Sequence, residues 1–249
     1  MKYLFLFVSI VFFENAQSQV IDSIKSVNHK QLQFEWKQLI IPTFLIGYGV
    51  IGIESDLINN FDEDINEELE ETIDDQFTID DFSTFVPAAS VYALNLFGVK
   101  GKNNFKDRTI ILSTATLIMG ASVLTLKSTT NVTRPDGSSD DSFPSGHTAV
   151  AFMGAEFLWQ EYKEVSVWYG ISGYAVAIGT GFFRMYNNRH WLTDVAAGAG
   201  IGILSTKIAY WLYPFLNSKL FKSEQSNSVN YLTPMIMNKQ YGLSFIKQF

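Results

Sequence analysis

The chain has 249 residues, of which 47% are hydrophobic and 15% aromatic, and this length and apolar content suit one domain with a sizeable core. Because it contains no cysteine, the chain can have neither a disulfide framework nor a thiolate metal site nor a cysteine nucleophile. Its formal net charge of −7, without a basic run, argues against nucleic acid as a partner.

The N-terminus has the pattern of a secretory signal peptide. One lysine precedes an apolar stretch over residues 3–13, and the small residues of Ala16-Gln17-Ser18 follow. The pattern predicts a signal peptide over residues 1–18, with a retained short membrane anchor as the alternative. In either case we expect the chain to be exported to the membrane or beyond it.

Six longer apolar segments predict the core of the protein. They exceed the usual length of strands, are rich in Ala, Leu, Ile and Gly, and do not alternate between apolar and polar residues. The expected fold class is therefore all-α, with a single domain over residues 19–220 built as a bundle of about six core helices. These helices are predicted at residues 39–53, 85–99, 109–126, 148–159, 165–183 and 195–216.

An acidic stretch, residues 54–81, separates the first two apolar segments. It holds 13 of the 25 acidic residues and neither lysine nor arginine. A charge run of this kind usually forms a solvated loop or a short acidic helix, so we interpret it as an insertion exposed to solvent. Binding of a cation or of a partner is the alternative interpretation.

Residues 221–249 are expected to form a separate tail. Two runs with partial alternation flank Asn238-Lys239-Gln240. This pattern is compatible with a short C-terminal β-hairpin.

The polar residues with the strongest chemical pattern flank the later apolar segments. They form three motifs, which are K-x6-R-P from Lys127 through Arg134, P-S-G-H from Pro144 to His147, and R-x5-H-x3-D from Arg184 through His190 to Asp194. The chain has only four arginines and three histidines, and two of each lie in these motifs.

His190 and Asp194 are four residues apart, so on one helix their side chains lie within reach of each other. A carboxylate bound to one ring nitrogen fixes the tautomer and leaves the other nitrogen free to attack. We therefore expect His190 to be a nucleophile that Asp194 orients.

An anion site is expected at the start of the fourth segment. Ser145 is a candidate N-cap there, and Gly146 allows close approach to the backbone N–H groups of the helix start. Lys127, Arg134 and Arg184 add three cations, which repel one another unless an anion lies between them. This combination predicts a phosphate site.

In this order, the three motifs resemble the signatures of the type 2 phosphatidic acid phosphatase superfamily, which also includes vanadium haloperoxidases. The motifs cover residues 127–194, and the helical spacing extends the resemblance to about residues 39–216. Phe183 stands where the family usually has serine before the arginine, which removes one hydroxyl from the expected phosphate site. Only eight residues separate Pro135 from Pro144, so we expect a short loop with little room for a substrate lid.

The resemblance implies a mechanism for these residues. His190 attacks phosphorus and forms a phosphohistidine, which Asp194 helps to orient. His147 protonates the leaving oxygen and then activates the hydrolytic water. The resemblance also implies which residues bind the phosphate oxygens. They are Lys127, Arg134, Ser145, Gly146 and Arg184. It implies no metal and no other cofactor, since the cations take that role.

The resemblance also implies a phosphatase for lipid phosphate monoesters or prenyl and lipid pyrophosphates. The alternatives are a soluble periplasmic acid phosphatase of broad specificity and a vanadium-dependent haloperoxidase. Six apolar segments favour a membrane enzyme, although the mean hydropathy of +0.09 is low and Glu156 and Lys207 interrupt two of them. We expect the cell membrane, with the active site facing the periplasm or the outside, and a soluble periplasmic protein as the alternative.

Overall fold

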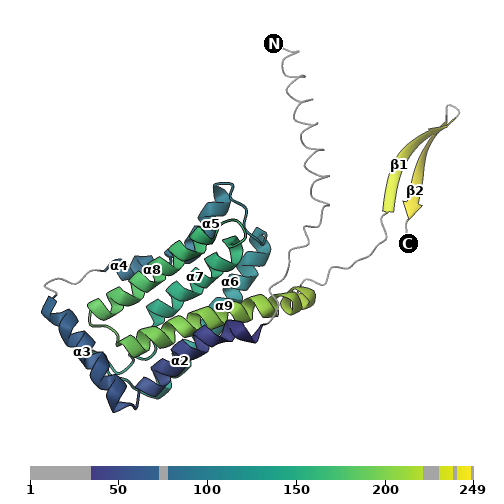
Figure 1. The fold of residues 1–249 in the computed structure, drawn as a ribbon. Coiled ribbons are helices and arrows are strands. Elements are labelled where there is room, and N and C mark those ends of the chain that lie inside the picture. The colour runs from purple at the N-terminus through teal and green to yellow at the C-terminus, as the bar shows by residue number, and fades with distance from the viewer. Residues whose placement is uncertain (1–34, 73–77, 221–229, 238–239, 248–249) are drawn as a thin grey trace, which may run out of the picture. The chain divides into compact units, whose positions relative to one another are not determined.

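The computed structural model describes residues 35–72, 78–220, 230–237 and 240–247 (Figure 1). The chain divides into two compact units, residues 1–210 and residues 211–249, which we describe separately. The predicted signal peptide lies outside the described residues. The domain boundaries predicted after residues 18 and 220 stay predictions.

All the regular elements in the described part of the first unit are helices, so the all-α prediction is confirmed. Each of the six predicted segments forms a helix whose ends lie within a few residues of the predicted ones. In chain order the helices are η1 (Trp36–Leu39), α2 (Ile40–Gly52), α3 (Asp56–Thr72), α4 (Ile79–Ser83), α5 (Val86–Leu96), α6 (Phe105–Thr130), α7 (Gly146–Tyr162), α8 (Val167–Tyr186) and α9 (Leu192–Leu220).

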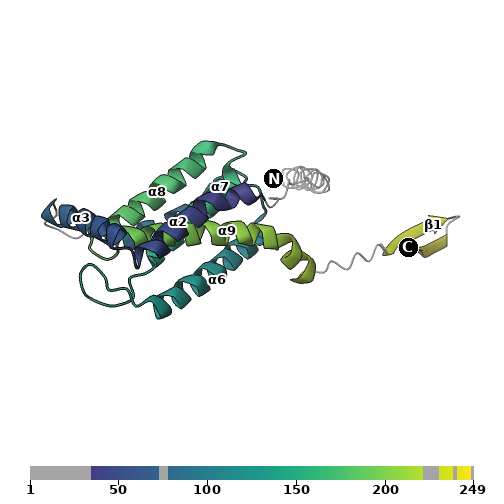
Figure 2. The ribbon, with the colours of Figure 1, turned by 60° about the horizontal axis from the view of Figure 1, so that its bottom comes forward.

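Helix α7 is the centre of the bundle. It packs against α5, α6 and α8, and it lies between α6 and α8 in Figures 1 and 2. Most of its side chains are buried, and several are alanines, which allow its neighbours to approach closely. The start of α7 therefore has a position fixed by its neighbours, and this start contains His147.

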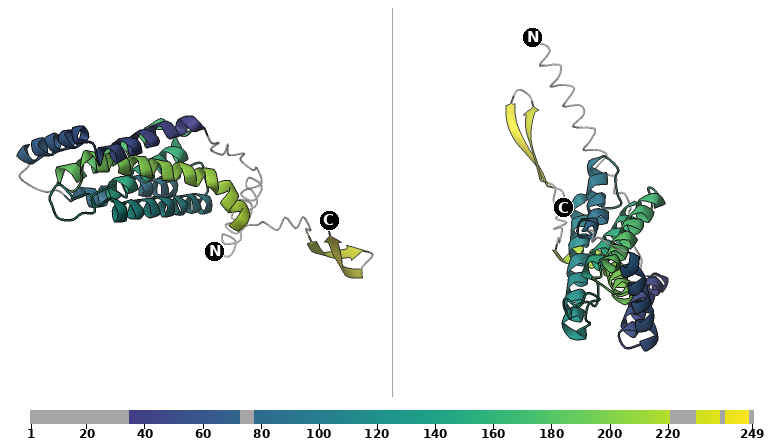
Figure 3. Two further views of the ribbon diagram at one scale, coloured as in Figure 1. Left: turned by 90° about the horizontal axis from the view of Figure 1, so that it is seen from below. Right: turned by 90° about the vertical axis from the view of Figure 1, so that its left-hand side faces the viewer.

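Helix α9 contacts α7 at positions where only glycine fits. A Cβ atom at Gly198 would lie 2.4 Å from the carbonyl oxygen of Ser145, and one at Gly202 would lie 2.3 Å from that of Ala149. Helix α2 runs along the opposite side of α9 (Figures 1 and 3), where a Cβ at Gly49 would lie 2.7 Å from the Thr193 carbonyl oxygen. These contacts hold the start of α9 beside the start of α7.

The described part of the acidic stretch forms two helices, α3 and α4, and α3 is an acidic helix of the predicted kind with most of its described carboxylates exposed. The α2–α3 pair bends by 94°, so that α3 turns away from α2 (Figure 1). Asp62 of α3 and Asp80 of α4 are buried, which contradicts the prediction for these two residues. The reason is that both carboxylates accept hydrogen bonds from distant parts of the chain, as described below.

Among the described residues, α6 and α9 are long and apolar enough to cross a membrane, and the bent α2–α3 pair adds a third candidate if it is counted as one span. Helix α6 exposes large apolar side chains, including Leu117 and Leu124. Exposed apolar helix faces of this size indicate contact with lipid. We therefore describe the protein as a membrane protein with fewer candidate spans than its six apolar segments suggested.

The second unit contains a two-stranded antiparallel hairpin. Strand β1 (Asn230–Met237) pairs with β2 (Gln240–Lys247), with Asn230 opposite Lys247 and Met237 opposite Gln240. The tail thus forms the hairpin that its alternating pattern allowed.

Candidate active site

The candidate site lies where α6 and α8 end and where α7 and α9 begin. The loops over residues 131–145 and 187–191 connect these four helix ends. A cavity of about 220 Å³ is lined by side chains from the predicted motifs, from α4 and from the segments beside them, which are Thr78, Asp80, Asp81, Arg134, His147, Arg184, Asn187 and Arg189. The fold thus brings His147, Arg134 and Arg184 to one cavity.

His190 and Asp194 form a buried pair. The distance from His190 Nδ1 to Asp194 Oδ2 is 3.4 Å, and the two side chains are 2% and 0% exposed. Ser142 supports the pair, since its hydroxyl donates to Asp194 Oδ2 at 2.5 Å and lies 3.3 Å from His190 Nδ1. Because Nδ1 faces the carboxylate, Nε2 is the ring nitrogen left for chemistry.

The pair is not built as the sequence suggested, with both residues on one helix. His190 precedes α9, and only Asp194 lies in its first turn. The Asp194 carboxylate turns back over the helix start and accepts a hydrogen bond from the backbone N–H of Trp191 at 2.9 Å. This turn, rather than helical spacing, brings the carboxylate to the imidazole.

Burial lowers the pKa of His190 to about 4, even though the Asp194 carboxylate opposes this shift. The positive charges of Arg184 and Lys127 lower the pKa further. The imidazole is therefore neutral near pH 7, which is the form that can act as a nucleophile.

His147 stands at the edge of the cavity with 39% of its side chain exposed. Its Nε2 lies 3.3 Å from Asp81 Oδ1. Burial and the Arg184 guanidinium lower the pKa of His147 below its ordinary value of 6.5, while Asp81 and Asp80 act in the opposite direction.

Lys127 and Arg134 converge on one carboxylate of the 131–145 loop. Arg134 Nη2 lies 3.0 Å from Asp141 Oδ1, and Lys127 Nζ lies 4.0 Å from Asp141 Oδ2. Lys127 also donates to the backbone carbonyl of Asp141. A hydrogen bond from the Ser139 hydroxyl and the charges of these two cations hold the pKa of Asp141 below its usual value.

Arg184 is buried against the acidic stretch. Its Nη1 lies 2.6 Å from Asp80 Oδ2 and 3.8 Å from Asp81 Oδ1, and Asn187 donates to Asp80 Oδ1 at 3.1 Å. Carboxylates of the chain itself thus lie between the three predicted cations, so the repulsion of the cations alone does not require a phosphate, and the phosphate site stays a prediction.

Ser145 and Gly146 lie at the start of α7 as predicted, but not with the predicted contacts. Ser145 occupies the N-cap position, yet its hydroxyl lies 2.9 Å from Thr148 Oγ1 and caps no backbone N–H. A Cβ at Gly146 would meet only Val123 at 3.8 Å, so packing within the described residues does not require glycine here. The ring of Phe183, in place of the expected serine, packs against Phe182 and Tyr186.

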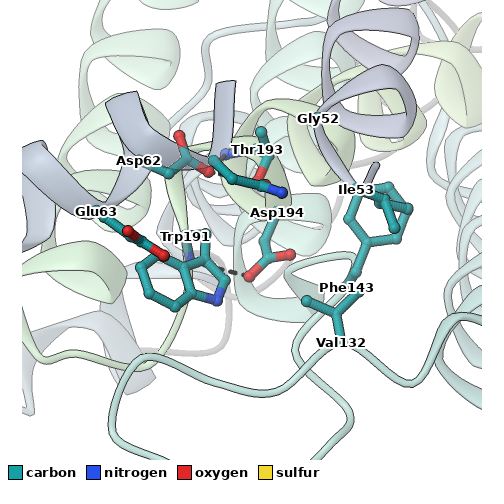
Figure 4. Close-up of a pocket in the computed structure, with 10 residues that line it drawn as sticks. Gly52, Ile53, Asp62, Glu63, Val132, Phe143, Trp191, Thr193 and Asp194 are labelled. Carbon is teal, nitrogen blue, oxygen red and sulfur yellow. Dashed lines mark hydrogen bonds between the residues drawn. The ribbon is translucent and has the colours of Figure 1, made fainter. Parts of the chain in front are cut away.

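Sequence reasoning missed Ser142, Asn187 and three carboxylates of the acidic stretch. Asp62 is one of these carboxylates, and its Oδ2 accepts hydrogen bonds from the Thr193 backbone N–H at 3.2 Å and from the Thr193 hydroxyl at 2.6 Å. Figure 4 shows Asp62 beside Thr193, with Asp194 lining the same cavity of about 200 Å³. The only signal in the sequence was the acidic stretch as a whole, which gave no reason to single out any of its residues.

No group of three or more His, Asp or Glu side chains in the described part of the chain is arranged to hold a metal ion. The cavity of about 220 Å³ is lined by three arginines and His147 together with Asp80 and Asp81, so cationic and anionic groups both face it.

The fold and the site define the class of this protein. It is a helical membrane protein with a histidine–carboxylate pair beside clustered cations. Residues 108–218 match the sequence model of the PAP2 superfamily, which confirms the resemblance that the three motifs indicated.

Two relatives show where the sequence similarity lies. The chain is 34% identical over 178 residues to the lipid A 1-phosphatase of Porphyromonas gingivalis, which covers 68% of this chain and 39% of that protein. It is 35% identical over 78 residues to the bacitracin transport permease protein BcrC of Bacillus licheniformis, which covers 31% of this chain and 36% of that one. The chain thus spans about two fifths of the length of the first relative.

Two solved structures are similar to the chain at low sequence identity. LpxE of Aquifex aeolicus is 23% identical, with a TM-score of 0.45 over 59% of this chain and 92% of that one. A transmembrane PAP2 type phosphatidylglycerolphosphate phosphatase of Bacillus subtilis is 22% identical, with a TM-score of 0.46 over 74% and 99%.

Proposed function

We propose that the chain is a phosphatase that hydrolyses phosphate esters of lipids through a phosphohistidine. The observation that supports this best is the buried His190–Asp194 pair, whose imidazole is neutral and lies in the field of Lys127 and Arg184. A neutral imidazole held by a carboxylate, among cations that can stabilise phosphoryl oxygens, is suited to nucleophilic attack on phosphorus.

In the proposed first step, His190 Nε2 attacks phosphorus, an N–P bond forms and the ester P–O bond breaks. His147, as imidazolium, gives its proton to the leaving oxygen. In the second step, neutral His147 takes a proton from water, the water oxygen bonds to phosphorus and the N–P bond breaks. The products are the alcohol and orthophosphate.

The phosphate would reach its cations by displacing one exposed carboxylate. The side chain of Asp141 is 50% exposed, so it can turn toward solvent and release Arg134 and Lys127. Asp81, on the same helix as Asp80, would stay at the edge of the cavity beside His147. Asp80 is buried and would stay on Arg184, holding its guanidinium in place.

The substrate class rests on two observations. The relative with 34% identity is named for a phosphate of lipid A, and α6 and α9 suit a membrane. An enzyme held in the membrane meets phosphates on lipids at short range. We therefore propose a lipid phosphate as substrate and a site that faces the periplasm or the outside.

Trapping of the phosphoenzyme tests this proposal. The purified full chain would be mixed with 32P-labelled p-nitrophenyl phosphate, quenched in alkali and assayed for protein-bound label, because phosphohistidine survives alkali and is lost in acid. We expect label in the wild type and none in His190→Ala. In His147→Ala we expect the label to accumulate, since p-nitrophenolate leaves without an acid but the water lacks its base.

The decisive control is the turnover of His190→Ala. Loss of activity by a factor of at least about 10³, with unchanged thermal unfolding, would support the nucleophile assignment. Turnover near that of the wild type would exclude His190 as the nucleophile.

A further inference from the structure

Two carboxylates of α4 form part of the wall of the phosphate cavity. Asp80 and Asp81 line it together with His147 and Arg184, and Asp81 Oδ1 is 3.3 Å from His147 Nε2. Contacts to the neighbouring helices hold α4 in this position, since the Thr84 hydroxyl donates to the His147 carbonyl oxygen at 2.8 Å and Ser83 Oγ lies 2.7 Å from Thr180 Oγ1. The fold thus holds the helix that carries both carboxylates at the wall of the cavity.

In the described part of the chain, carboxylates balance the positive charges of the site. Lys127 and Arg134 share Asp141, Arg184 contacts both Asp80 and Asp81, and Arg189 Nη1 lies 3.0 Å from Asp136 Oδ2. Four cations are therefore matched by four carboxylates. A bound anion can displace the exposed Asp141, but it finds no further cation of the site that lacks a carboxylate partner.

Asp81 also has a definite place relative to the reaction. In the proposed mechanism His147 protonates the leaving oxygen, so the side of the cavity next to His147 is the side from which the leaving group departs. The leaving group of a monoester is an alcohol without charge near the ester oxygen. The leaving group of a diphosphate is itself a phosphate, whose charge would lie beside the Asp81 carboxylate.

We infer that Asp80 and Asp81 make this site selective for phosphate monoesters over diphosphates, with Asp81 as the residue that repels a second phosphate. The inference rests on the proposed phosphatase function and narrows its substrate class. It excludes the prenyl and lipid pyrophosphates that the sequence motifs alone left open.

The test compares two substrates with the same apolar chain, farnesyl phosphate and farnesyl diphosphate, in detergent micelles. We expect the wild type to have the higher kcat/KM for the monophosphate. Asp81→Asn keeps the shape of the side chain and removes its charge. In this variant we expect kcat/KM for the diphosphate to rise about tenfold relative to the monophosphate, as for one like charge roughly 6 Å away at an effective dielectric constant of about 40, between the value near a protein surface and that of water.

Asp64→Asn is the matched control, because it removes one exposed carboxylate from the same acidic stretch without touching the cavity. We expect its ratio of the two kcat/KM values to equal that of the wild type. Equal use of both substrates by the wild type, or an unchanged ratio in Asp81→Asn, would overturn the inference and leave the proposed function standing. If neither farnesyl ester nor p-nitrophenyl phosphate is hydrolysed, the proposed function itself fails, and the inference fails with it.

Discussion

The two histidines of the candidate site differ in depth, and this difference suits the different roles that we propose for them. His190 is 2% exposed and pairs with a carboxylate that is itself fully buried, whereas His147 is 39% exposed and pairs with the half-exposed Asp81. A nucleophile benefits from a fixed orientation and a neutral ring. An acid and base must exchange protons with the leaving group and with water, so it benefits from exposure.

The pKa directions of these residues predict an acidic pH optimum. His190 must be neutral to attack, and its pKa of about 4 places the acid limb of kcat/KM near that pH. His147 must be protonated to act as an acid, and its pKa lies below 6.5, so activity should fall as the pH rises toward neutrality. Measurement of kcat/KM against pH for farnesyl phosphate, whose leaving alcohol needs an acid, should give a bell-shaped curve with its maximum between these limits. A maximum above neutrality would contradict the assigned roles.

At the scale of elements, the start of α9 shows how the acidic stretch contributes to the site. Asp62, on α3, accepts two hydrogen bonds from Thr193, the second residue of α9. The next residue along α9 is Asp194, the carboxylate that pairs with His190. A helix that the sequence assigned to solvent thus caps the helix that positions the proposed nucleophile.

Removal of this cap is expected to lower the stability and the proposed activity of the protein, although Asp62 would not contact the substrate. Asp62→Ala should destabilise the fold by about 1–2 kcal/mol, because the Thr193 N–H and hydroxyl lose their acceptor, and should lower kcat more than it raises KM. Asp62→Asn keeps an acceptor oxygen and should recover most of both effects. Thermal unfolding in detergent measures the loss of stability, and steady-state kinetics measure kcat and KM. Asp64→Ala, at an exposed neighbouring position, is the control.

An unchanged unfolding midpoint in Asp62→Ala would show that the Asp62–Thr193 contact does not stabilise the start of α9. A change in KM alone would instead place Asp62 in substrate binding.

The six core helices and the meeting of the three motifs could be predicted because they depend on local patterns. Long apolar segments without alternation indicate helices, and motifs at the ends of consecutive helices have few ways to lie apart. The roles of Asp62 and Asp80 could not be predicted in this way. Their partners Thr193 and Arg184 are 131 and 104 residues away in the chain, and no local pattern distinguishes these two aspartates from their acidic neighbours.

The position of His190 shows a second limit of sequence reasoning. A spacing of four residues is compatible with one face of a helix, but it is equally compatible with a loop residue whose partner lies in the first turn. Which of the two occurs depends on where α9 begins. Helix boundaries are the least certain part of such a prediction.

At the scale of the whole molecule, the first unit combines a buried helix with exposed apolar ones. Helix α7 is enclosed by its neighbours, whereas α6 exposes Leu117 and Leu124 along its length. A helix that bears the site can therefore be short and contain buried polar residues, while longer helices around it meet the lipid.

This arrangement predicts that a charge at the middle of α6 impairs membrane insertion. Leu117→Arg lies near the centre of the helix and should cost about 2.5–3.5 kcal/mol of insertion free energy, so less protein should resist extraction of membranes with alkaline carbonate. Phe105→Arg, at the first residue of the same helix, is the matched control, since a long side chain there can reach the interface. Equal extraction of the two variants, or release of the wild-type protein, would contradict a membrane-spanning α6.

The pairing of each cation with an internal carboxylate also bears on how the protein assembles. A pocket made only of positive groups would depend on phosphate in the medium to hold its walls together. Here the countercharges are encoded in the polypeptide, and the cavity can reach its final shape before any ester arrives. The protein should therefore fold and survive purification in buffers free of phosphate.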